Sequence, residues 1–588
     1  MNRSTDSYFS HLPTLNFPRS RFKQQTVKRL QSQSHGTLTP FFIDIVYPGD
    51  TWSIDTNIFA RADISVKVPL DTIFVDTYYF FIPFRILDKD FEKILGGVDA
   101  YDTNIYSFPQ ITLGYGDLSQ VYEKDTGYFA DTALWFLPNY LNYHVSDLTG
   151  AASNNVLIDH IMAYGPMSYY MVFNEFFRDE NVDNIIPIDD IKGNTVTLDN
   201  NSIDICKSYD PDDVVDALPL LQVNKYHDYF TSSILSPSKG PQVTLPLGIS
   251  APIITETGVH DMGTGLLFGN DVANGGSPTS HSLVLTKWNA AKYGNVFEDN
   301  DSISTQSTNN RAITTSNLVA DLRNATAASI NQFAIALKLE QLYQRRAIYG
   351  TRLTEVYRGQ WGLNVPDDLI DRPEYLGGVK VDLNNIPVLN TTSSGQGEMV
   401  GNSATLFNDG GFTKSFLEYG IIIGLSCTRV KHTYTQGVMK RLHDLKDGID
   451  LYNPVFAMLG PQTVARRELY NKLTTAGEDR STPFAYQEAW ADLREGQSGV
   501  AGVFDPMFTG TTEFKTYWSF ADYYSSAPIF SADWLKESPA NVCRTMSGNL
   551  ISGAAAVGGH QYLFDYQSHV TVYRELPARS RLSLFDRY

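Results

Sequence analysis

One stretch of the chain combines the side chains of a hydrolase active site. Residues 226–235, YHDYFTSSIL, hold a histidine (His227), an acid (Asp228) and two serines (Ser232 and Ser233). A Ser-His-acid triad needs its members to be adjacent in space, and neighbouring side chains on a strand point to opposite faces. No GxSxG elbow surrounds either serine. We therefore favour polar residues at a strand start or in a loop over a catalytic site.

Other candidate sites have weaker support. Residues 410–415, GGFTKS, resemble a phosphate-binding loop but lack its spacing and the glycine before Lys414. The 11 histidines are dispersed without an HExxH pair, so a catalytic zinc site is not expected. The acidic clusters at 211–216 and 297–301 lack the register of an EF-hand. The sequence predicts no cofactor and leaves open a weak divalent cation at subunit contacts.

Basic residues near the two ends of the chain are candidate nucleic-acid contacts. Residues 1–38 are polar and basic, with phenylalanines between the cations, and we interpret them as an extended arm. Such an arm could neutralise phosphates while its rings stack on bases. The alternatives are a solvated tail or an arm that packs against a neighbouring subunit. The candidate cations are Arg19, Arg21, Lys23, Lys28 and Arg29, and near the C-terminus Arg579, Arg581 and Arg587.

Composition limits the broad class of protein. The 588 residues are 42% hydrophobic and 13% aromatic, which is ample for a large core and favours strands over helical bundles. With a formal net charge of -19, the chain needs local basic patches or a cationic partner to bind nucleic acid. Its three cysteines form no CxxC pair, which predicts neither a zinc knuckle nor a disulfide framework. No apolar run approaches the about 20 residues that span a bilayer, so we expect a soluble protein.

Two-residue alternation predicts strands near both ends of the chain. From 51 to 68 the even positions are mostly apolar and the odd ones mostly polar, as in one long strand, or two joined by a bend, with one buried face. Residues 561–576 repeat the pattern. Residues 71–86 end apolar on both faces, as expected of a strand buried between layers. Before the first of these strands comes Pro48-Gly49-Asp50, whose Pro-Gly pair suits the central positions of a type II turn.

Helices and long loops are expected between these strands. Residues 156–178 are apolar but interrupted by Gly165-Pro166, which predicts two short helices. Residues 327–349 contain no proline or glycine, and their wide apolar face predicts a mostly buried helix that stops at Gly350. Residues 253–315 are rich in Gly, Asn, Ser and Thr, which indicates a long surface excursion.

Several blocks of the sequence together resemble the major capsid proteins of the microviruses, in particular the gokushovirus branch. The stretch IVYPGDTWSID (45–55) is similar to the hairpin motif of that family, carried here by Pro48, Gly49 and Asp50. Further blocks follow in the family order, at 59–71, 78–87, 169–182, 225–248, 349–378 and 411–437. Because YHDYFTSSIL falls inside one of these blocks, we interpret it as scaffold.

The resemblance implies an all-β core with α-helical and loop insertions, built as a single eight-stranded antiparallel jelly roll of the viral capsid type. The implied organisation is a basic N-terminal arm (1–38) and a jelly-roll capsid domain (39–588). Its insertions would lie at about 88–225 (mixed helix and loop), about 253–315 (a surface protrusion at the threefold axis) and about 316–411 (helix and loops).

The resemblance also implies a structural role without enzymatic activity. The chain would self-associate through pentamers into a T=1 icosahedral shell of about 60 copies around a circular single-stranded DNA genome. It would be a virion component assembled in the cytoplasm of a bacterial host, without membrane insertion. Implied partners are a small basic DNA-binding virion protein, a pilot or minor virion protein and a host surface receptor. The alternative is a monomeric carbohydrate-binding or glycoside-active β-sandwich protein, which differs in its assembly state.

Overall fold

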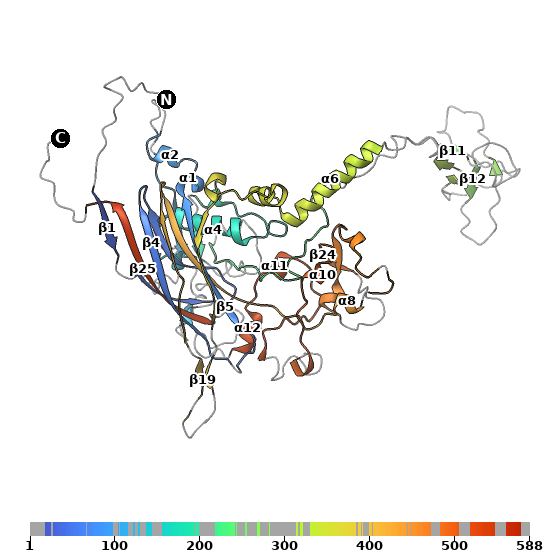
Figure 1. Cartoon of the computed structure of the whole chain (residues 1–588). Helices are drawn as coiled ribbons and strands as arrows, with labels where there is room; N and C mark the ends of the chain where they lie inside the picture. The colour runs from blue at the N-terminus through green and yellow to red at the C-terminus, as the bar shows by residue number, and fades with distance from the viewer. Residues whose placement is uncertain are drawn as a thin grey trace, which may run out of the picture. The chain divides into compact units, whose positions relative to one another are not determined.

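The chain divides into two compact units (Figure 1). The first is Met1–Lys239 with Gln344–Tyr588, and the second is Gly240–Tyr343. The computed structural model describes residues 18–577 apart from gaps, of which the longest are 144–155, 199–217, 244–252, 256–266, 271–280, 283–312, 321–329, 472–481, 505–517 and 547–559. No described helix is both long enough and apolar enough to cross a membrane.

A six-stranded antiparallel sheet forms one layer of the first unit. Its strands run in the order β1-β25-β4-β20, with β2 also paired to β25 and β21 to β4. Their bounds are β1 Arg19–Lys23, β2 Val27–Gln33, β4 Thr51–Ala62, β20 Ala404–Asn408, β21 Phe412–Ser415 and β25 Tyr562–Glu575. Along β4 and β25 every even position up to Ala62 and Val572 is buried. The predicted alternating strands at both ends of the chain are therefore confirmed.

The first of these strands is shorter than predicted. The alternation extends to residue 68, whereas β4 ends at Ala62. The next residue, Asp63, is buried and its carboxylate accepts the N–H of Ile64 at 2.7 Å. A local bond of this kind competes with the hydrogen bonds of a ladder, and it marks the point where the strand stops.

A second antiparallel sheet, of five strands, lies against the first. Its order is β16-β5-β22-β3, with β17 also paired to β5. The bounds are β3 Thr39–Val46, β5 Ile73–Pro83, β16 Glu374–Gly377, β17 Lys380–Leu383 and β22 Gly420–Val430. Along β22, ten of the 11 residues are buried. Most of β5 is also buried, which confirms the prediction of a strand enclosed between layers.

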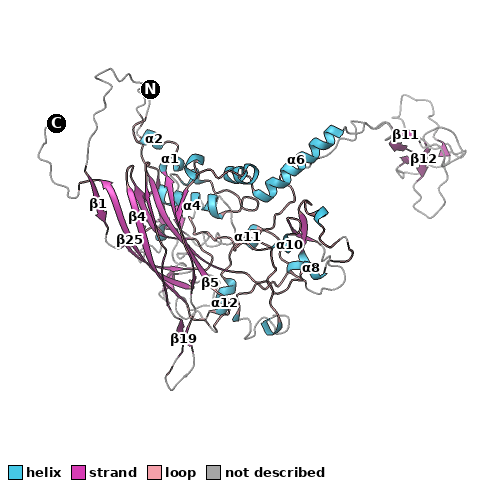
Figure 2. Ribbon diagram, viewed as in Figure 1, coloured by secondary structure: helices cyan, strands magenta, loops and turns pink. Residues whose placement is uncertain are grey.

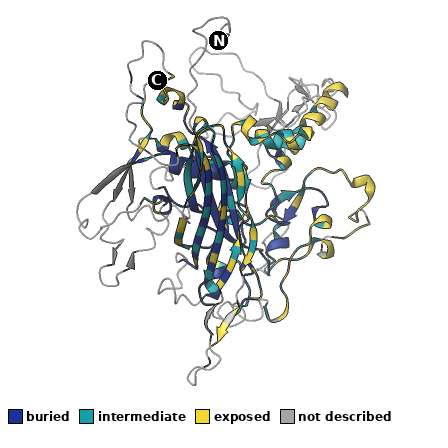
Figure 3. Ribbon diagram, turned by 60° about the vertical axis from the view of Figure 1, so that its left-hand side comes forward, coloured by how far each residue is buried: buried dark blue, intermediate teal, exposed yellow. Residues whose placement is uncertain are grey.

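Two hydrophobic cores lie on opposite faces of this second sheet. The long strands of the first unit lie side by side (Figure 2), and buried positions are frequent along them (Figure 3). Toward the first sheet, Tyr79 and Phe81 of β5 join Trp52 in one core. On the other face, Phe80 and Ile82 join a second core that contains helix α4 (Tyr164–Val172). Burying each such aromatic side chain contributes about 1.5–3 kcal/mol. The first unit therefore has three layers, namely sheet, sheet and helices.

The predicted pair of helices at 156–178 is wrong in its first half. Residues Val156–Met162 form strand β9, which pairs with β6 (Gln110–Tyr115). β6 also pairs in parallel with β10 (Thr195–Leu198). The helix α4 then begins at Tyr164 and continues as a π-helix over Phe173–Phe177. Pro166 does not break it because it lies in the first turn, where a helix needs no N–H donor.

The long predicted helix exists, but it is not buried. Helix α6 spans Ile330–Tyr349 and stops before Gly350, whose φ is +88°, as predicted. Four of its large apolar side chains are exposed by 38–60%, namely Phe333, Ile335, Leu337 and Leu339. The predicted burial of this helix is therefore wrong for the single chain.

The second unit contains short antiparallel strands among its described residues. β11 (Ile253–Thr255) pairs with β15 (Leu318–Ala320). β12 (Leu267–Asn270) lies between β13 (His281–Ser282) and β14 (Ile313–Thr315). The surface excursion predicted at 253–315 falls inside this unit, and most of its residues lie outside the described ones.

Candidate functional site

The stretch that resembles a hydrolase site is a structural turn. The Asp228 carboxylate accepts the backbone N–H groups of Phe230 (2.9 Å) and Thr231 (2.8 Å) with one oxygen. Its other oxygen accepts the hydroxyl of Tyr434 at 2.7 Å. The rings of Phe230 and Tyr434 pack edge to face within a third hydrophobic core, whereas His227 is exposed. Asp228 therefore holds the turn in place, and the stretch is scaffold, as the sequence indicated.

The turn at Pro48–Asp50 has the predicted form. Gly49 has a φ of +88°, which only glycine adopts without strain. The turn is closed by the N–H of Asp50, which donates to the carbonyl of Tyr47 at 3.1 Å. A hydrogen bond from the N–H of Gly49 to the carbonyl of Phe416 (2.9 Å) attaches the turn to a distant part of the chain.

The Asp50 side chain of this turn binds Arg574 of the last strand, β25. Its carboxylate is buried and accepts from the Trp52 indole at 3.2 Å. Arg574 of β25 reaches the same carboxylate with Nε at 3.0 Å and Nη2 at 2.6 Å. A bidentate guanidinium-carboxylate pair fixes geometry as well as charge. The turn is therefore bonded to a residue 524 positions away in the sequence. The role of Arg574 was not predicted from the sequence.

Three predicted nucleic-acid contacts form an exposed row on the edge strand β1. Arg19, Arg21 and Lys23 occupy alternate positions of the strand and share its exposed face; we call them the basic row. β1 pairs with β25, so these residues belong to a sheet and not to a free arm. Arg19 is anchored, since its Nη2 donates to the carbonyl of Gly49 (2.8 Å) and to the Thr51 hydroxyl (2.6 Å).

The remaining predicted cations lie in different surroundings. Lys28 of β2 is exposed and forms an ion pair with Asp565 at 3.1 Å. Its neighbour Arg29 donates to the carbonyl of Tyr140, and burial lowers the pKa of Arg29 to about 10. Arg29 therefore has a structural role in the folded chain. Arg579, Arg581 and Arg587 lie outside the described residues.

A buried charge cluster joins distant parts of the first unit, and sequence reasoning missed it. It consists of His35, Lys225, His432, Asp522 and Glu537, each at most 7% exposed. Nε2 of His35 and Nε2 of His432 lie 3.0 and 2.9 Å from the carboxylate of Glu537. Asp522 accepts from Lys225 Nζ and lies against His432 Nδ1, each at 3.0 Å. Buried charges persist only when they are paired in this way.

The cluster keeps His432 positively charged. Burial alone would lower the pKa of His432, but the carboxylates of Glu537 and Asp522 outweigh it and raise that pKa to about 10. Burial would likewise raise the pKa of Glu537, and the two histidines instead lower it to about 2. The cluster is therefore a network of opposite charges at neutral pH. Among the residues that the structure describes, no group of three or more His, Cys, Asp or Glu side chains could hold a metal.

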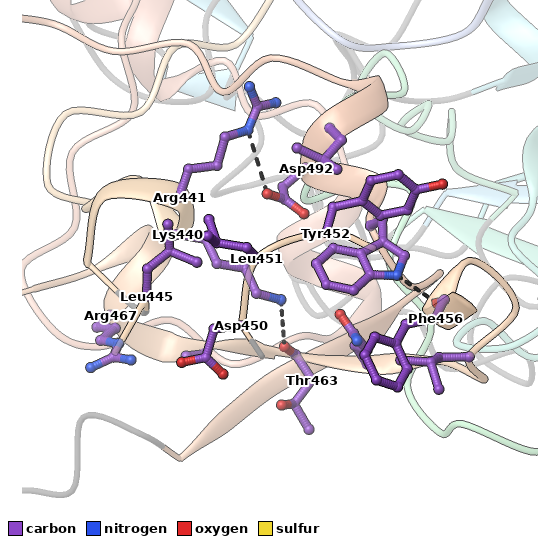
Figure 4. A pocket seen from close by; sticks show the side chains of 15 residues that line it. Lys440, Arg441, Leu445, Asp450, Leu451, Tyr452, Phe456, Thr463, Arg467 and Asp492 are labelled. Atoms are coloured by element: carbon purple, nitrogen blue, oxygen red, sulfur yellow. Dashed lines mark hydrogen bonds and ion pairs between the residues drawn. The ribbon is translucent and has the colours of Figure 1, made fainter. Parts of the chain in front are cut away.

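A large cavity opens beside the third core (Figure 4). Its volume is about 1120 Å³. Leucines, three aromatic rings, cations and two aspartates line it. The elements around it are α8 (Lys440–His443), a 3-10 turn (Pro454–Phe456), β23 (Gln462–Ala465) and α10 (Ala491–Arg494). The rings of Tyr452 and Trp490 meet edge to face, with centroids 5.3 Å apart. Arg441 forms an ion pair with Asp492 at 3.4 Å on the wall.

Comparisons with known proteins place this architecture among virus proteins. A family model described as "Capsid protein (F protein)" matches residues 10–583. The chain is 31% identical over 532 residues to the capsid protein VP1 of Spiroplasma virus 4, covering 88% of each chain. It is 29% identical over 543 residues to capsid protein VP1 of Bdellovibrio phage phiMH2K, covering 91% of each. Capsid protein VP1 of Chlamydia phage 1 is 28% identical over 586 residues, covering 90% of this chain and 91% of the relative.

Proposed function

Since the chain belongs to the capsid protein (F protein) family, we propose that about 60 copies of it form a T=1 icosahedral shell around a circular single-stranded DNA genome. It is a structural capsid protein and a component of the virion, whose copies assemble around the genome. The observation that carries this conclusion is the extent of the family match, which runs through both sheets. The resemblance to microvirus capsid proteins drawn from the sequence is confirmed.

The finer architecture that we propose is a single eight-stranded jelly roll of the capsid type. Two antiparallel sheets that share one aromatic core support it, because a jelly roll is one of the folds built from two facing sheets of this kind. Two sheets packed in this way form a rigid wedge, and the loops at the strand ends are free to make subunit contacts. Pentamers are the intermediate that we expect on the route to the shell.

We place the genome against the exposed face of β1. The basic row of Arg19, Arg21 and Lys23 supports this, since phosphates attract exposed cations. The chain as a whole has a net charge of -19, so it would otherwise repel DNA. A small basic DNA-binding virion protein would supply the remaining positive charge. We leave Arg29 out of this surface because its guanidinium is engaged within the chain.

The second unit is our candidate for contact with the host. Residues 253–315 lie within it, and their composition suits an exposed segment. The resemblance to the gokushovirus branch implies that this segment forms a protrusion at the threefold axis. A bacterial surface receptor would be the partner there, and a minor virion protein would complete the particle. Replacing residues 263–310 by a short linker is expected to leave a folded, assembling protein that attaches poorly to host cells.

Assembly state is the measurement that tests the proposed function. The chain is expressed alone and with the other virion proteins, and is then examined by size-exclusion chromatography with light scattering and by negative-stain electron microscopy. Closed particles or pentameric rings are expected in at least one of these preparations. A strictly monomeric chain in both would contradict the proposal.

The rival interpretation was a monomeric carbohydrate-binding or glycoside-active β-sandwich protein. The three relatives cover about nine-tenths of the chain, and all are named capsid proteins. In addition, the one stretch with the residues of an active site is a structural turn. We therefore set the rival aside.

A further inference from the structure

The outward face of the first sheet carries an exposed aromatic ring beside the basic row. Tyr573 of β25 lies directly opposite Arg21 of β1 and is 40% exposed. Because Val572 lies in the core, the alternation along the strand directs Tyr573 outward. The Arg21 guanidinium lies 5.8 Å from the centre of the Tyr573 ring. A cation and a ring therefore lie side by side on one surface.

Hydroxyl groups cover the sheet next to this pair. The hydroxyls of Thr51 and Ser415 lie 2.7 Å apart, and the hydroxyl of Thr413 donates to that of Ser53 at 2.9 Å. We call the basic row, Tyr573 and the neighbouring outward hydroxyl residues the polar face. These hydroxyl residues are Thr51, Ser53, Thr413, Ser415 and Thr571.

We propose that the polar face binds single-stranded DNA, with successive phosphates on the basic row and a base stacked on the ring of Tyr573. The inference rests on the proposed function, which places the genome against β1, and it adds how the strand is held there. Alternate residues of a β-strand lie about 6.7 Å apart, which is close to the spacing of successive phosphates in an extended single strand. Every base has a π-face, so stacking on one ring holds any sequence.

The charge of the polar face suits a phosphate backbone. On these strands its three cations face one outward carboxylate, Glu575, which lies opposite Arg19. The next outward carboxylate, Asp55, lies beyond Ser53 and opposite His569. The whole chain, by contrast, has 65 acidic and 46 basic residues. The polar face is therefore locally positive on an acidic protein, and it attracts an anionic strand that the net charge of the chain would repel.

A second copy of the chain is also anionic, but it fits the polar face less well. The centre of an interface between copies is apolar, whereas Tyr573 is the one large exposed apolar side chain on the polar face. A protein partner would bury the Thr and Ser hydroxyls there without apolar contacts around them. A nucleic acid uses all three kinds of group, because phosphates accept from cations and hydroxyls and bases stack on the ring. The composition of the face therefore favours DNA.

Salt dependence tests the two kinds of contact separately. Binding of a dye-labelled oligothymidylate to the full chain is measured by fluorescence anisotropy at a series of salt concentrations. Tyr573→Leu is expected to weaken binding by about tenfold at every salt concentration and to leave the salt slope unchanged, because stacking releases no counterions. Arg21→Gln is expected to reduce the slope by about 0.7, the contribution of one phosphate on a single strand.

Two control variants separate stacking from a general effect of the substitution. Tyr573→Phe keeps the ring and is expected to restore the binding that Tyr573→Leu loses. Tyr523→Leu makes the same change at a tyrosine that is 39% exposed and lies outside the polar face, so it should bind the oligonucleotide as the wild type does. All of these variants are expected to keep the thermal transition of the wild type, since each changed position is exposed.

The results that overturn the inference differ from those that overturn the proposed function. Equal binding by Tyr573→Leu and the wild type would rule out the stacked base, and an unchanged salt slope in Arg21→Gln would rule out the phosphate contact. A wild-type chain that fails to bind the oligonucleotide even at low salt would overturn both contacts. Failure of the proposed function is a separate result, namely a chain that never assembles.

A photo-crosslinking phenylalanine derivative at position 573 identifies the occupant in intact particles. Irradiation is expected to attach the chain covalently to DNA, which nuclease digestion and mass spectrometry of the labelled peptide detect. A covalent dimer of the chain would assign the polar face to a subunit contact, and it would overturn the inference, as would the absence of any crosslink. Irradiated particles without the label serve as the control.

Discussion

Helices α4 and α6 are both rich in apolar residues, but the side chains of α4 are buried whereas several apolar side chains of α6 are exposed. In α4 the side chains of Tyr169 and Tyr170 are completely buried, and their hydroxyls donate to the carbonyls of Leu38 and Pro219, each at 2.8 Å. In α6 the side chains of Phe333 and Ile335 are more than half exposed. The difference teaches that an apolar helical segment can be recognised from its sequence, whereas its burial depends on what packs against the helix in the fold.

The largest loss of stability is expected for a substitution in the buried helix α4. Replacing Tyr170 with Ala removes a fully buried ring and leaves the Pro219 carbonyl without its donor. The free energy of unfolding should fall by about 4 kcal/mol, as for other aromatic truncations in cores. Denaturant titration of the free chain measures it. A loss below about 1 kcal/mol would show that α4 contributes little to the core, and the contrast with α6 would then collapse.

The control for this substitution is Tyr170→Phe. It keeps the ring in place and removes the hydroxyl that donates to the carbonyl of Pro219. The expected loss is about 1 kcal/mol, the usual contribution of one such bond. The difference between the two variants isolates the packing of the ring.

The buried charge cluster should make the interior sensitive to pH, with an expected effect of about 3 kcal/mol from breaking a buried pair. The pKa of His432 is raised to about 10, so its contribution is complete below the unfolded value of about 6.5 and is lost as pH rises toward 10. The pKa of Glu537 is lowered to about 2, so its contribution is complete above about 4.5 and is lost as pH falls toward 2.

Both contributions are complete only between about pH 4.5 and 6.5. Unfolding by denaturant at a series of pH values should therefore give the greatest stability in that window. The variant His432→Gln should lower the maximum free energy of unfolding and flatten the decline of that free energy above pH 6.5. An unchanged decline would mean that other groups cause it. Substitutions on the exposed face of α6 should leave the pH profile as it is, which separates the interior from the exposed helix.

The sequence predicted the strands well because their pattern is local. β4 and β25 each bury one face, so their period of two is visible without knowing what covers them. The strand β9 was mistaken for a helix, since seven largely apolar residues fit either structure and its pairing partner β6 lies far away in the sequence. The end of α6 was predictable from Gly350, whereas the exposure of its side chains depends on what surrounds the helix.

The sites were predictable only where a motif marks them. The turn Pro48–Asp50 could be found because its glycine requires a positive φ. Its partner Arg574 could not, since a single arginine in a strand carries no signal. The buried charge cluster combines residues from His35 to Glu537, each ordinary in its own segment. Such a network becomes visible only when the fold brings its members together.

A smaller effect on stability is expected for substitutions in the basic row. Its side chains are exposed like those of α6, but they are cations and therefore suit a polar partner. Arg21→Gln/Lys23→Gln should change the free energy of unfolding by less than about 0.5 kcal/mol, as is usual for surface positions. The retention of DNA by purified particles should be lower than in the wild type at each salt concentration, and it should fall less steeply as salt rises, because each lost cation weakens phosphate binding and removes one released counterion. The ratio of absorbance at 260 and 280 nm after salt washes measures it. Lys93→Gln, at another exposed lysine, is the control.

Unchanged DNA retention in that variant would assign the basic row to a subunit contact or to solvent. Arg19→Gln provides a further distinction. Because Arg19 donates to Gly49 and Thr51, its loss should lower stability by about 1 kcal/mol whether or not DNA is present.

The smallest effect on folding, and a large one on assembly, is expected for the exposed helix itself. Ile335→Asp places a carboxylate where the side chain is 60% exposed, so the free energy of unfolding of the free chain should change by less than about 0.5 kcal/mol. If another copy covers the helix in the proposed shell, the yield of particles should nevertheless fall, because the carboxylate would then be buried. Ile335→Leu keeps the face apolar and should assemble normally. If Ile335→Asp instead destabilises the free chain as strongly as Tyr170→Ala, α6 is covered by its own chain and the two helices do not differ.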